Sequence, residues 1–101
     1  YDDNEVLLGM KKRGFGEGKW NGFGGKVEQE EAIDVAALRE LQEECGCKAS
    51  RDALRRRAVL TFIFENDSTV MQVHVFSLAL AALEGTPAES DEMRPRLFKV
   101  S

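Results

Sequence analysis

Three glutamates in a short polar stretch, Glu40, Glu43 and Glu44, are the residues whose types and spacing first suggest chemistry. Each residue of an α-helix turns by about 100°, so the three carboxylates would share an arc of about 100° on one face. The neighbouring arc, which would pack against a sheet, consists of Ala37, Leu38, Leu41 and Cys45. Carboxylate oxygens at the edge of such a contact suit Mg²⁺ or Mn²⁺, which in turn bind phosphate oxygens. The stretch therefore predicts a metal site for phosphate chemistry.

A solvent-exposed acidic face is the alternative interpretation of the same helix. Like charges three or four residues apart cost about 0.2–0.5 kcal/mol on an isolated helix. Arg39 precedes Glu43 by four residues and Lys48 follows Glu44 by four, so both would offset part of that cost. Glu40 has no cation at that spacing. On the helix alone, both interpretations stay open.

A glycine-rich stretch directly before this helix favours phosphate binding, because main-chain N–H groups approach a phosphate closely where no side chain intervenes. Six glycines lie from Gly14 to Gly25. The P-loop pattern is excluded, since Trp20 stands where its first glycine is required and Val27 stands where it needs Ser or Thr. The dinucleotide-binding glycine pattern does not fit either.

Glycine and proline divide the chain into the elements that must position these residues. A helix is expected from Glu31 to Cys45, because this stretch is rich in good helix formers and Gly46 suits a left-handed C-terminal cap. The expected strands are Val6–Lys12, a short extended piece at Trp20–Phe23, the hairpin strands Val59–Glu65 and Val70–Leu78, and an edge strand at Arg94–Val100. The pattern indicates an α+β fold.

Composition limits the class of protein. The 101 residues, 43% hydrophobic and 32% charged, are expected to form one small domain, and the net charge of -4 argues against binding a nucleic-acid polymer. No stretch approaches the roughly 18 apolar residues of a membrane span and Tyr1 begins no signal-peptide pattern, so a cytoplasmic protein is expected. Cys45 and Cys47 lack the partners of a zinc site and are expected to be buried thiols, and His74 is expected to be structural.

One longer pattern joins the glycine loop to all three glutamates. It runs as Gly25, five residues, Glu31, seven residues, Arg39-Glu40-Leu41, one residue, Glu43-Glu44, one residue, Gly46. This pattern resembles the Nudix box, with Cys47 in place of the family's usual aliphatic residue. The resemblance implies a Nudix-type α/β/α sandwich with a mixed sheet, of which residues 1–101 form a single, partial domain.

The resemblance also implies a reaction and a set of roles. Members of the family hydrolyse nucleoside diphosphates linked to another moiety, with Mg²⁺ as cofactor and Mn²⁺ as an alternative. Glu40, Glu43 and Glu44 would hold the metal on the substrate's phosphates, Arg39 would orient or balance these acids, and Glu31 would brace the loop. In-line displacement on a phosphate chain needs positioning and charge neutralisation more than a covalent nucleophile.

A closer similarity covers most of the chain and points to one branch of the family. Its segments are Gly9–Gly16, Trp20–Val27, Val73–Phe76, Gly85–Pro87 and Glu89–Pro95. This branch converts oxidised purine nucleoside triphosphates such as 8-oxo-dGTP and 2-hydroxy-dATP to monophosphate and pyrophosphate. The similarity implies a monomer that sanitises the nucleotide pool of the cytoplasm, with nuclear or mitochondrial pools as alternatives.

The same similarity implies a substrate site. Asn21 would bind the purine, Lys11 would approach the phosphates or sugar, and the Gly24 carbonyl and Glu92 would complete the metal shell. The remaining substrate-binding residues would be Phe15, Phe23, Gly24, Gly25, Lys26, Phe62, Phe64 and Met71. From the residues alone, Phe62 and Phe64 would be core, Asn21 an ordinary turn residue and Trp20 a packing residue.

Departures from this branch keep other functions open. The branch continues beyond both ends of this sequence and has a Trp where Leu97 stands, so metal and phosphate contacts are expected to be kept better than purine selectivity. One alternative is the same scaffold acting on another nucleoside diphosphate derivative. The other is a truncated, non-catalytic fragment that binds metal or a partner.

Overall fold

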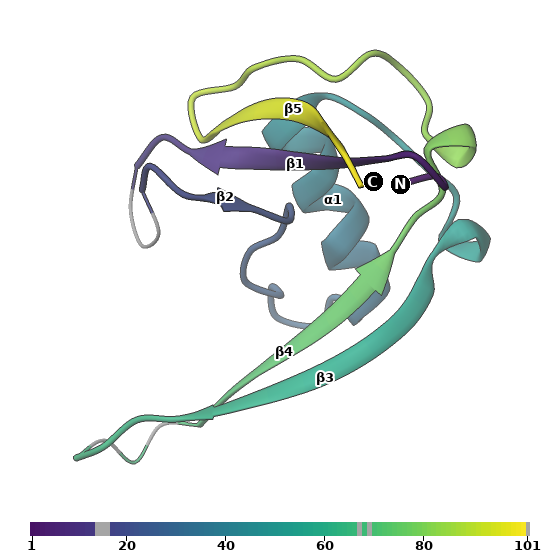
Figure 1. The fold of residues 1–101 in the computed structure, drawn as a ribbon. Coiled ribbons are helices and arrows are strands. Elements are labelled where there is room, and N and C mark those ends of the chain that lie inside the picture. The colour runs from purple at the N-terminus through teal and green to yellow at the C-terminus, as the bar shows by residue number, and fades with distance from the viewer. Residues whose placement is uncertain (14–16, 67, 69, 101) are drawn as a thin grey trace.

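The computed structural model describes residues 1–13, 17–66, 68 and 70–100. These residues form five strands and one α-helix, whose arrangement Figure 1 shows. The elements are β1 (Glu5–Lys11), β2 (Trp20–Asn21), α1 (Ile33–Cys45), β3 (Arg55–Ile63), β4 (Val70–Ser77) and β5 (Met93–Lys99), with short 3₁₀ turns at η1 (Arg51–Ala53) and η2 (Leu80–Ala82). The predicted elements and the α+β class are confirmed, with small shifts in their bounds.

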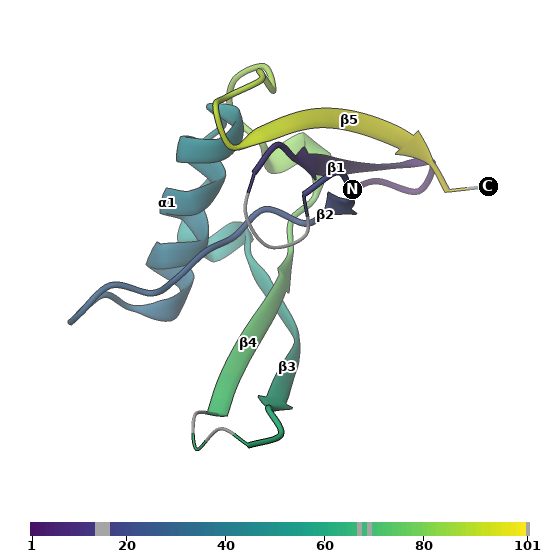
Figure 2. The same ribbon diagram turned by 90° about the vertical axis from the view of Figure 1, so that its left-hand side faces the viewer.

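One sheet has the strand order β2-β1-β5, with both pairings antiparallel. β5 is an edge strand, as its Pro95 predicts, and it pairs with the whole of β1. α1 lies beside this sheet, where it contacts β5 (Figure 2). In the part of the chain that the structure describes, every strand pairing is antiparallel and α1 is the single α-helix, so the two antiparallel sheets take the place of the mixed sheet that the resemblance implies.

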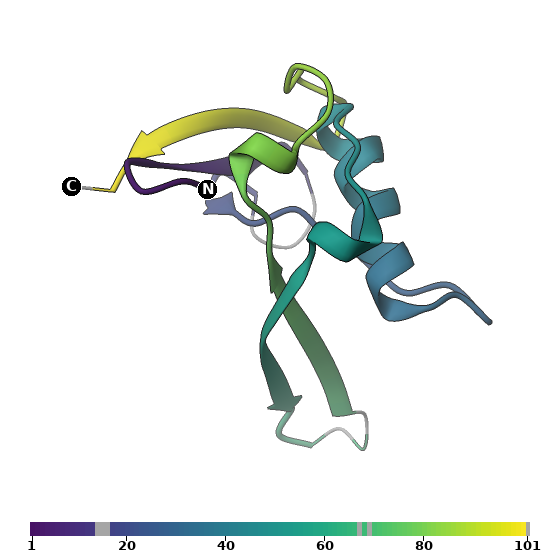
Figure 3. The same cartoon turned by 90° about the vertical axis from the view of Figure 1, so that its right-hand side faces the viewer.

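The second sheet is the predicted hairpin of β3 and β4, paired in register from Phe62↔Met71 back to Ala58↔Val75. A bulge at Arg57 shifts the register near the start of β3 and the end of β4. β3 begins at Arg55, four residues before the expected start at Val59, so three arginines belong to the strand. Figure 3 shows the hairpin leaving the rest of the fold, with its far end away from α1 and the first sheet.

α1 begins at Ile33, two residues later than expected, and ends as predicted. Gly46 adopts the left-handed conformation with φ 78°, and its N–H bonds to the carbonyl of Gln42. The buried face of the helix differs from the prediction. Ala36 and Cys45 are buried, whereas Ala37, Leu38 and Leu41 are only partly covered. The buried face of the helix also includes Glu44, which accepts a hydrogen bond from the glycine loop.

The fully buried apolar residues are Ala36, Cys45, Cys47 and Met93. The two cysteines are free thiols, as predicted. His74 is partly buried, which agrees with a structural role. Within the described ranges, no helix is long and apolar enough to cross a membrane.

Candidate active site

Glu44 is the most unusual charged residue of the protein, because only 3% of its surface is exposed. Its Oε1 accepts a hydrogen bond of 2.8 Å from the main-chain N–H of Gly24. The pKa of Glu44 is raised to about 6. Burial is the main cause and the neighbouring charge of Glu40 adds to it, while the hydrogen bond from the Gly24 N–H acts in the opposite direction. Glu44 is therefore a buried carboxylate that lacks full neutralisation and touches the glycine loop.

Glu40 lies against the next glycine of that loop. A Cβ atom on Gly25 would stand 2.5 Å from the carboxyl carbon of Glu40 and 2.6 Å from both of its oxygens. A side chain at this position would fit only if the Glu40 carboxylate moved, so glycine allows this carboxylate to lie against the loop. Gly24 and Gly25 thus place main chain directly against two of the three predicted acids.

Arg39 is the centre of the ion-pair network on this side of the helix. Its Nε donates to Glu31 at 2.8 Å, and its Nη1 donates to Glu40 at 2.8 Å and to Glu43 at 3.2 Å. Its Nη2 also donates to the carbonyl of Lys26 at 3.0 Å, which joins the helix to the loop. Glu40, which has no cation four residues away in the sequence, is nevertheless paired, because the long Arg39 side chain reaches its sequence neighbour.

Glu31 occupies a position consistent with its predicted role as a brace. Its Oε1 accepts the main-chain N–H of Glu28 at 3.0 Å, while both of its oxygens accept from Arg39. The hydrogen bonds from Arg39 lower the pKa of Glu31, so it stays ionised. Glu30, directly before it, has the left-handed φ of 65°. The tight turn at Glu30 and the carboxylate of Glu31 together hold the end of the loop on the helix.

Glu43 and Glu92, the other two proposed carboxylate ligands, are less enclosed. The side chain of Glu43 is 56% exposed and bonded to Arg39. Glu92 is bound by the guanidinium of Arg13, which lowers its pKa. The charge of Glu92 also raises the pKa of Glu44, so these two carboxylates are electrostatically close. Across the described residues, no three His, Cys, Asp or Glu side chains are gathered closely enough to form a metal cage.

The donor set nevertheless fits a hard cation. Glu44 is desolvated, and the charges of Glu40 and Glu92 disfavour its ionised form. A divalent ion beside these oxygens would remove that penalty, because its charge is larger than any local one. The alternative of a purely solvated acidic face does not describe Glu44, which is buried.

A cavity of about 1620 Å³ adjoins this cluster and is lined mainly by apolar side chains. It brings together most of the proposed substrate-binding residues, namely Lys11, Asn21, Phe23, Gly24, Gly25, Lys26 and Met71. Phe62 and Phe64 do not line it, although Met71, which pairs with Phe62 in the hairpin, does. Phe15 lies outside the described residues. The cavity is larger than the roughly 300–1,000 Å³ typical of a ligand site.

Aromatic residues near the cavity have packing roles. Phe23 fills the space above Gly9, since a Cβ there would stand 2.9 Å from its ring. Trp20 packs edge-on against Phe98, with ring centroids 4.9 Å apart, which agrees with its predicted packing role.

The side-chain amide of Asn21 donates from Nδ2 to the carbonyl of Lys19 at 3.0 Å. Asn21 is exposed and is one of the residues that line the cavity.

Sequence reasoning missed the pairing of Arg13 with Glu92 and of Lys12 with Glu89. Lys12 binds Glu89 at 2.6 Å and the carbonyl of Ser90 at 2.9 Å. The signal was present, because residues 11–13 are all basic and residues 89–92 are mostly acidic. These ion pairs fasten the segment that carries Glu92 to the end of β1.

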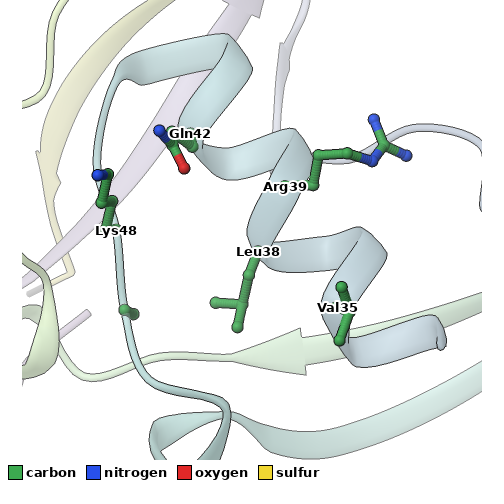
Figure 4. A pocket seen from close by; sticks show the side chains of 6 residues that line it. Val35, Leu38, Arg39, Gln42 and Lys48 are labelled. Atoms are coloured by element: carbon green, nitrogen blue, oxygen red, sulfur yellow. The ribbon is translucent and has the colours of Figure 1, made fainter. Parts of the chain in front are cut away.

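A shallower hollow of about 270 Å³ lies on another side of α1. Its lining includes Val35, Leu38, Gln42 and Lys48, and Figure 4 shows Leu38 projecting from α1 toward the segment that carries Lys48. Arg39 lies at its margin, with its guanidinium turned away from it. The hollow contains none of the proposed acidic ligands, whereas the larger cavity is lined by Gly24 and Gly25, which contact Glu44 and Glu40.

Comparison with known proteins identifies the class to which this fold and site belong. The family model for the NUDIX domain matches residues 1–100, so the chain belongs to the NUDIX family. Among its relatives are the oxidized purine nucleoside triphosphate hydrolases of Danio rerio, 54% identical over 95 residues, and of Mus musculus, 52% identical over 95 residues. Each match covers 94% of this chain and 58% of the relative. The chain therefore spans less than two thirds of the length of these relatives.

Solved structures show the same fold. The MutT NUDIX hydrolase from Burkholderia pseudomallei superposes with a TM-score of 0.77 at 28% identity, covering 98% of this chain and 74% of that one. The E. coli ORF135 protein superposes with a TM-score of 0.71 at 23% identity, covering 95% of this chain and 65% of that one. The second similarity shows the fold alone.

Proposed function

We propose that this chain hydrolyses oxidised purine nucleoside triphosphates to the monophosphate and pyrophosphate with Mg²⁺, or Mn²⁺, as cofactor. The observation that carries the proposal is the contact between the glycine loop and the helix, where buried Glu44 accepts from Gly24 and Glu40 lies against Gly25. The choice of substrate rests on the similarity to the two oxidized purine nucleoside triphosphate hydrolases.

The proposed metal ligands are Glu40, Glu43, Glu44, Glu92 and the Gly24 carbonyl. When bound, the metal supplies a Lewis acid that withdraws charge from phosphate oxygens. Glu44, whose pKa burial raises to about 6 in the absence of a metal, would be held in its ionised form by the metal.

The other residues position the substrate and the acids. Arg39 holds Glu40 and Glu43 toward the loop and thereby fixes two of the acids at once. Glu31 keeps Arg39 in place and ties it to the loop. We assign phosphate or sugar contacts to Lys11 and purine recognition to Asn21. The other residues of the proposed substrate site are Phe15, Phe23, Gly24, Gly25, Lys26, Phe62, Phe64 and Met71.

The test is release of pyrophosphate from 8-oxo-dGTP and from dGTP in the presence of Mg²⁺. Wild type, Glu44→Gln and the exposed control Glu84→Gln are compared at equal concentration. We expect wild type and Glu84→Gln to hydrolyse 8-oxo-dGTP faster than dGTP, and Glu44→Gln to lose at least about 100-fold in rate.

Two results would change the proposal in different ways. Equal background rates in all three proteins would reject catalysis and favour a non-catalytic metal- or partner-binding role. Similar rates on both nucleotides would keep a NUDIX hydrolase and reject selectivity for oxidised purines.

A further inference from the structure

The segment directly before β5, residues 88–92, is bonded both to the end of the helix and to the end of β1. At one end of the segment, the N–H of Ala88 donates to the carbonyl of Cys45, the last residue of α1, at 2.9 Å. At the other end, the carbonyl of Glu92 accepts the N–H of Lys12, which follows β1, also at 2.9 Å. Figure 2 shows the chain passing beside the end of α1 before it enters β5. The main chain that carries Glu92 is therefore fixed to α1 and to β1.

The main chain around Glu92 is held by bonds that do not involve Arg13. The N–H groups of Glu92 and Met93 both donate to the hydroxyl of Ser90 at 3.2 Å, and the N–H of Ser90 donates to the carbonyl of Met93 at 2.9 Å. Together with the bond from the N–H of Lys12, these contacts place the backbone of Glu92. The guanidinium of Arg13 acts instead on the Glu92 side chain.

Arg13 binds one of the two oxygens of the Glu92 carboxylate. Its Nε donates to Oε1 at 3.0 Å, and its Nη2 donates to the same oxygen. Within the described residues, Oε2 of Glu92 accepts no hydrogen bond. The hydrogen bonds from Arg13 lower the pKa of Glu92, so the carboxylate stays ionised. One charged oxygen of Glu92 is therefore available to a cation.

The Glu92 carboxylate is held within electrostatic reach of Glu44. Burial is the main cause of the raised pKa of Glu44, and the charge of Glu92 adds to it even though Glu92 is paired with Arg13. The charge of Lys11 lowers the pKa of Glu44, and it adds to the effect of Arg13 in lowering the pKa of Glu92. Because both carboxylates respond to the same cation, they lie on the same side of the site.

Without a partner, the Glu92 side chain would be free to turn into solvent. A glutamate side chain has several rotatable bonds, and it loses conformational freedom when a ligand fixes it. A hydrogen-bond donor that already holds the carboxylate removes part of this loss before the ligand arrives. Carboxylates that bind metals are commonly held in this way, and loss of the partner typically lowers metal affinity or activity by about 10–100-fold.

From these contacts we propose that Arg13 is a positioning residue, which presents the free oxygen of Glu92 to a divalent cation shared with Glu44. The inference rests on the proposed metal site and adds to it a residue that touches neither the metal nor the substrate. It also fixes the sign of an effect. Removing Arg13 should weaken metal binding, although it takes a positive charge away from the site.

The test is the affinity of the whole chain for Mn²⁺ without nucleotide, measured from the electron paramagnetic resonance signal of free Mn²⁺. Arg13→Gln should raise the dissociation constant by about tenfold, because the two-donor contact with Glu92 is lost. Arg13→Lys keeps the charge but offers one nitrogen in place of two, so its dissociation constant should lie between those of wild type and Arg13→Gln. Circular dichroism checks that each variant is folded.

The matched control is Arg94→Gln, which removes a second guanidinium from the same part of the surface. The Arg94 side chain is 55% exposed against 64% for Arg13, and it pairs with Glu89 at 3.3 Å instead of with Glu92. Loss of an exposed positive charge by itself slightly favours a cation. Arg94→Gln should therefore leave the dissociation constant unchanged or lower it by less than about threefold.

A double variant shows whether Arg13 acts through Glu92. Glu92→Gln should itself weaken Mn²⁺ binding, because it removes a proposed ligand. Adding Arg13→Gln to Glu92→Gln should cause no further loss, since no carboxylate remains for Arg13 to position.

The outcomes separate this proposal from the proposed metal site. Mn²⁺ binding in Arg13→Gln that is as tight as in wild type, or tighter, would overturn the positioning role, because Arg13 would then be a simple surface charge or would withhold Glu92 from the metal. The same loss with and without the Glu92 carboxylate would also overturn it, since Arg13 would then act on another group. A wild-type chain that binds no Mn²⁺ would instead refute the metal site itself.

Discussion

Replacing Glu44 by glutamine should stabilise the protein at neutral pH while it abolishes the proposed chemistry. Glu44 has a pKa of about 6 in the folded protein against an ordinary value of 4.5, chiefly because it is buried. Each unit is worth about 1.4 kcal/mol, so keeping this carboxylate ionised costs the folded state about 2 kcal/mol.

The sign follows from the direction of the shift. Because the folded pKa is raised, the folded state binds its proton more tightly than the unfolded chain does. The cost is therefore absent below the unfolded value of 4.5, grows as the pH rises toward 6, and is complete above it. The glutamine of the variant would carry no charge at any pH, and its side-chain oxygen could still accept the N–H of Gly24.

Urea unfolding with a metal chelator present measures this difference, at about pH 4 and about pH 7.5. We expect Glu44→Gln and wild type to unfold alike at the lower pH, and the variant to be more stable by about 2 kcal/mol at the higher pH. Glu84→Gln, at an exposed site, should differ from wild type at neither pH. A variant that is less stable than wild type at the higher pH would refute the view that Glu44 is an uncompensated buried charge.

Two further predictions test the loop that faces the helix. Gly25→Ala should lower the rate of hydrolysis by about 100-fold with little loss of stability, because its Cβ displaces the Glu40 carboxylate by roughly 1 Å. The control is Gly22→Ala, whose Cβ would have no atom within 4 Å. Equal rates of hydrolysis in the two variants would contradict the proposed role of Glu40. Glu30→Gly should raise the free energy of unfolding by up to about 1 kcal/mol, since glycine adopts the observed φ of 65° without the penalty of a side chain. Thermal unfolding measures this, and Gln29→Gly should show no such gain.

Much of the fold followed from the sequence, because the relevant signals are local. The helix and its end at Gly46 depend on residues that are close in the chain, and so does the β-hairpin. The spacing of Glu40, Glu43 and Glu44 is set by helical geometry once the helix forms. The Nudix box could be found for the same reason, since its parts are contiguous in the sequence.

The tertiary structure alone decided which acids are buried and what binds them. Glu44 is buried, whereas Glu43, one residue away, is exposed, because the exact direction in which α1 packs determines which side loses contact with water. Arg13 reaches Glu92 only because β1 pairs with β5, although the two strands are far apart in the sequence. Phe62 and Phe64 remain outside the cavity because the position of the hairpin depends on contacts between distant segments. Local sequence sets the conformation of each element, but burial and electrostatic environment arise from how those elements meet.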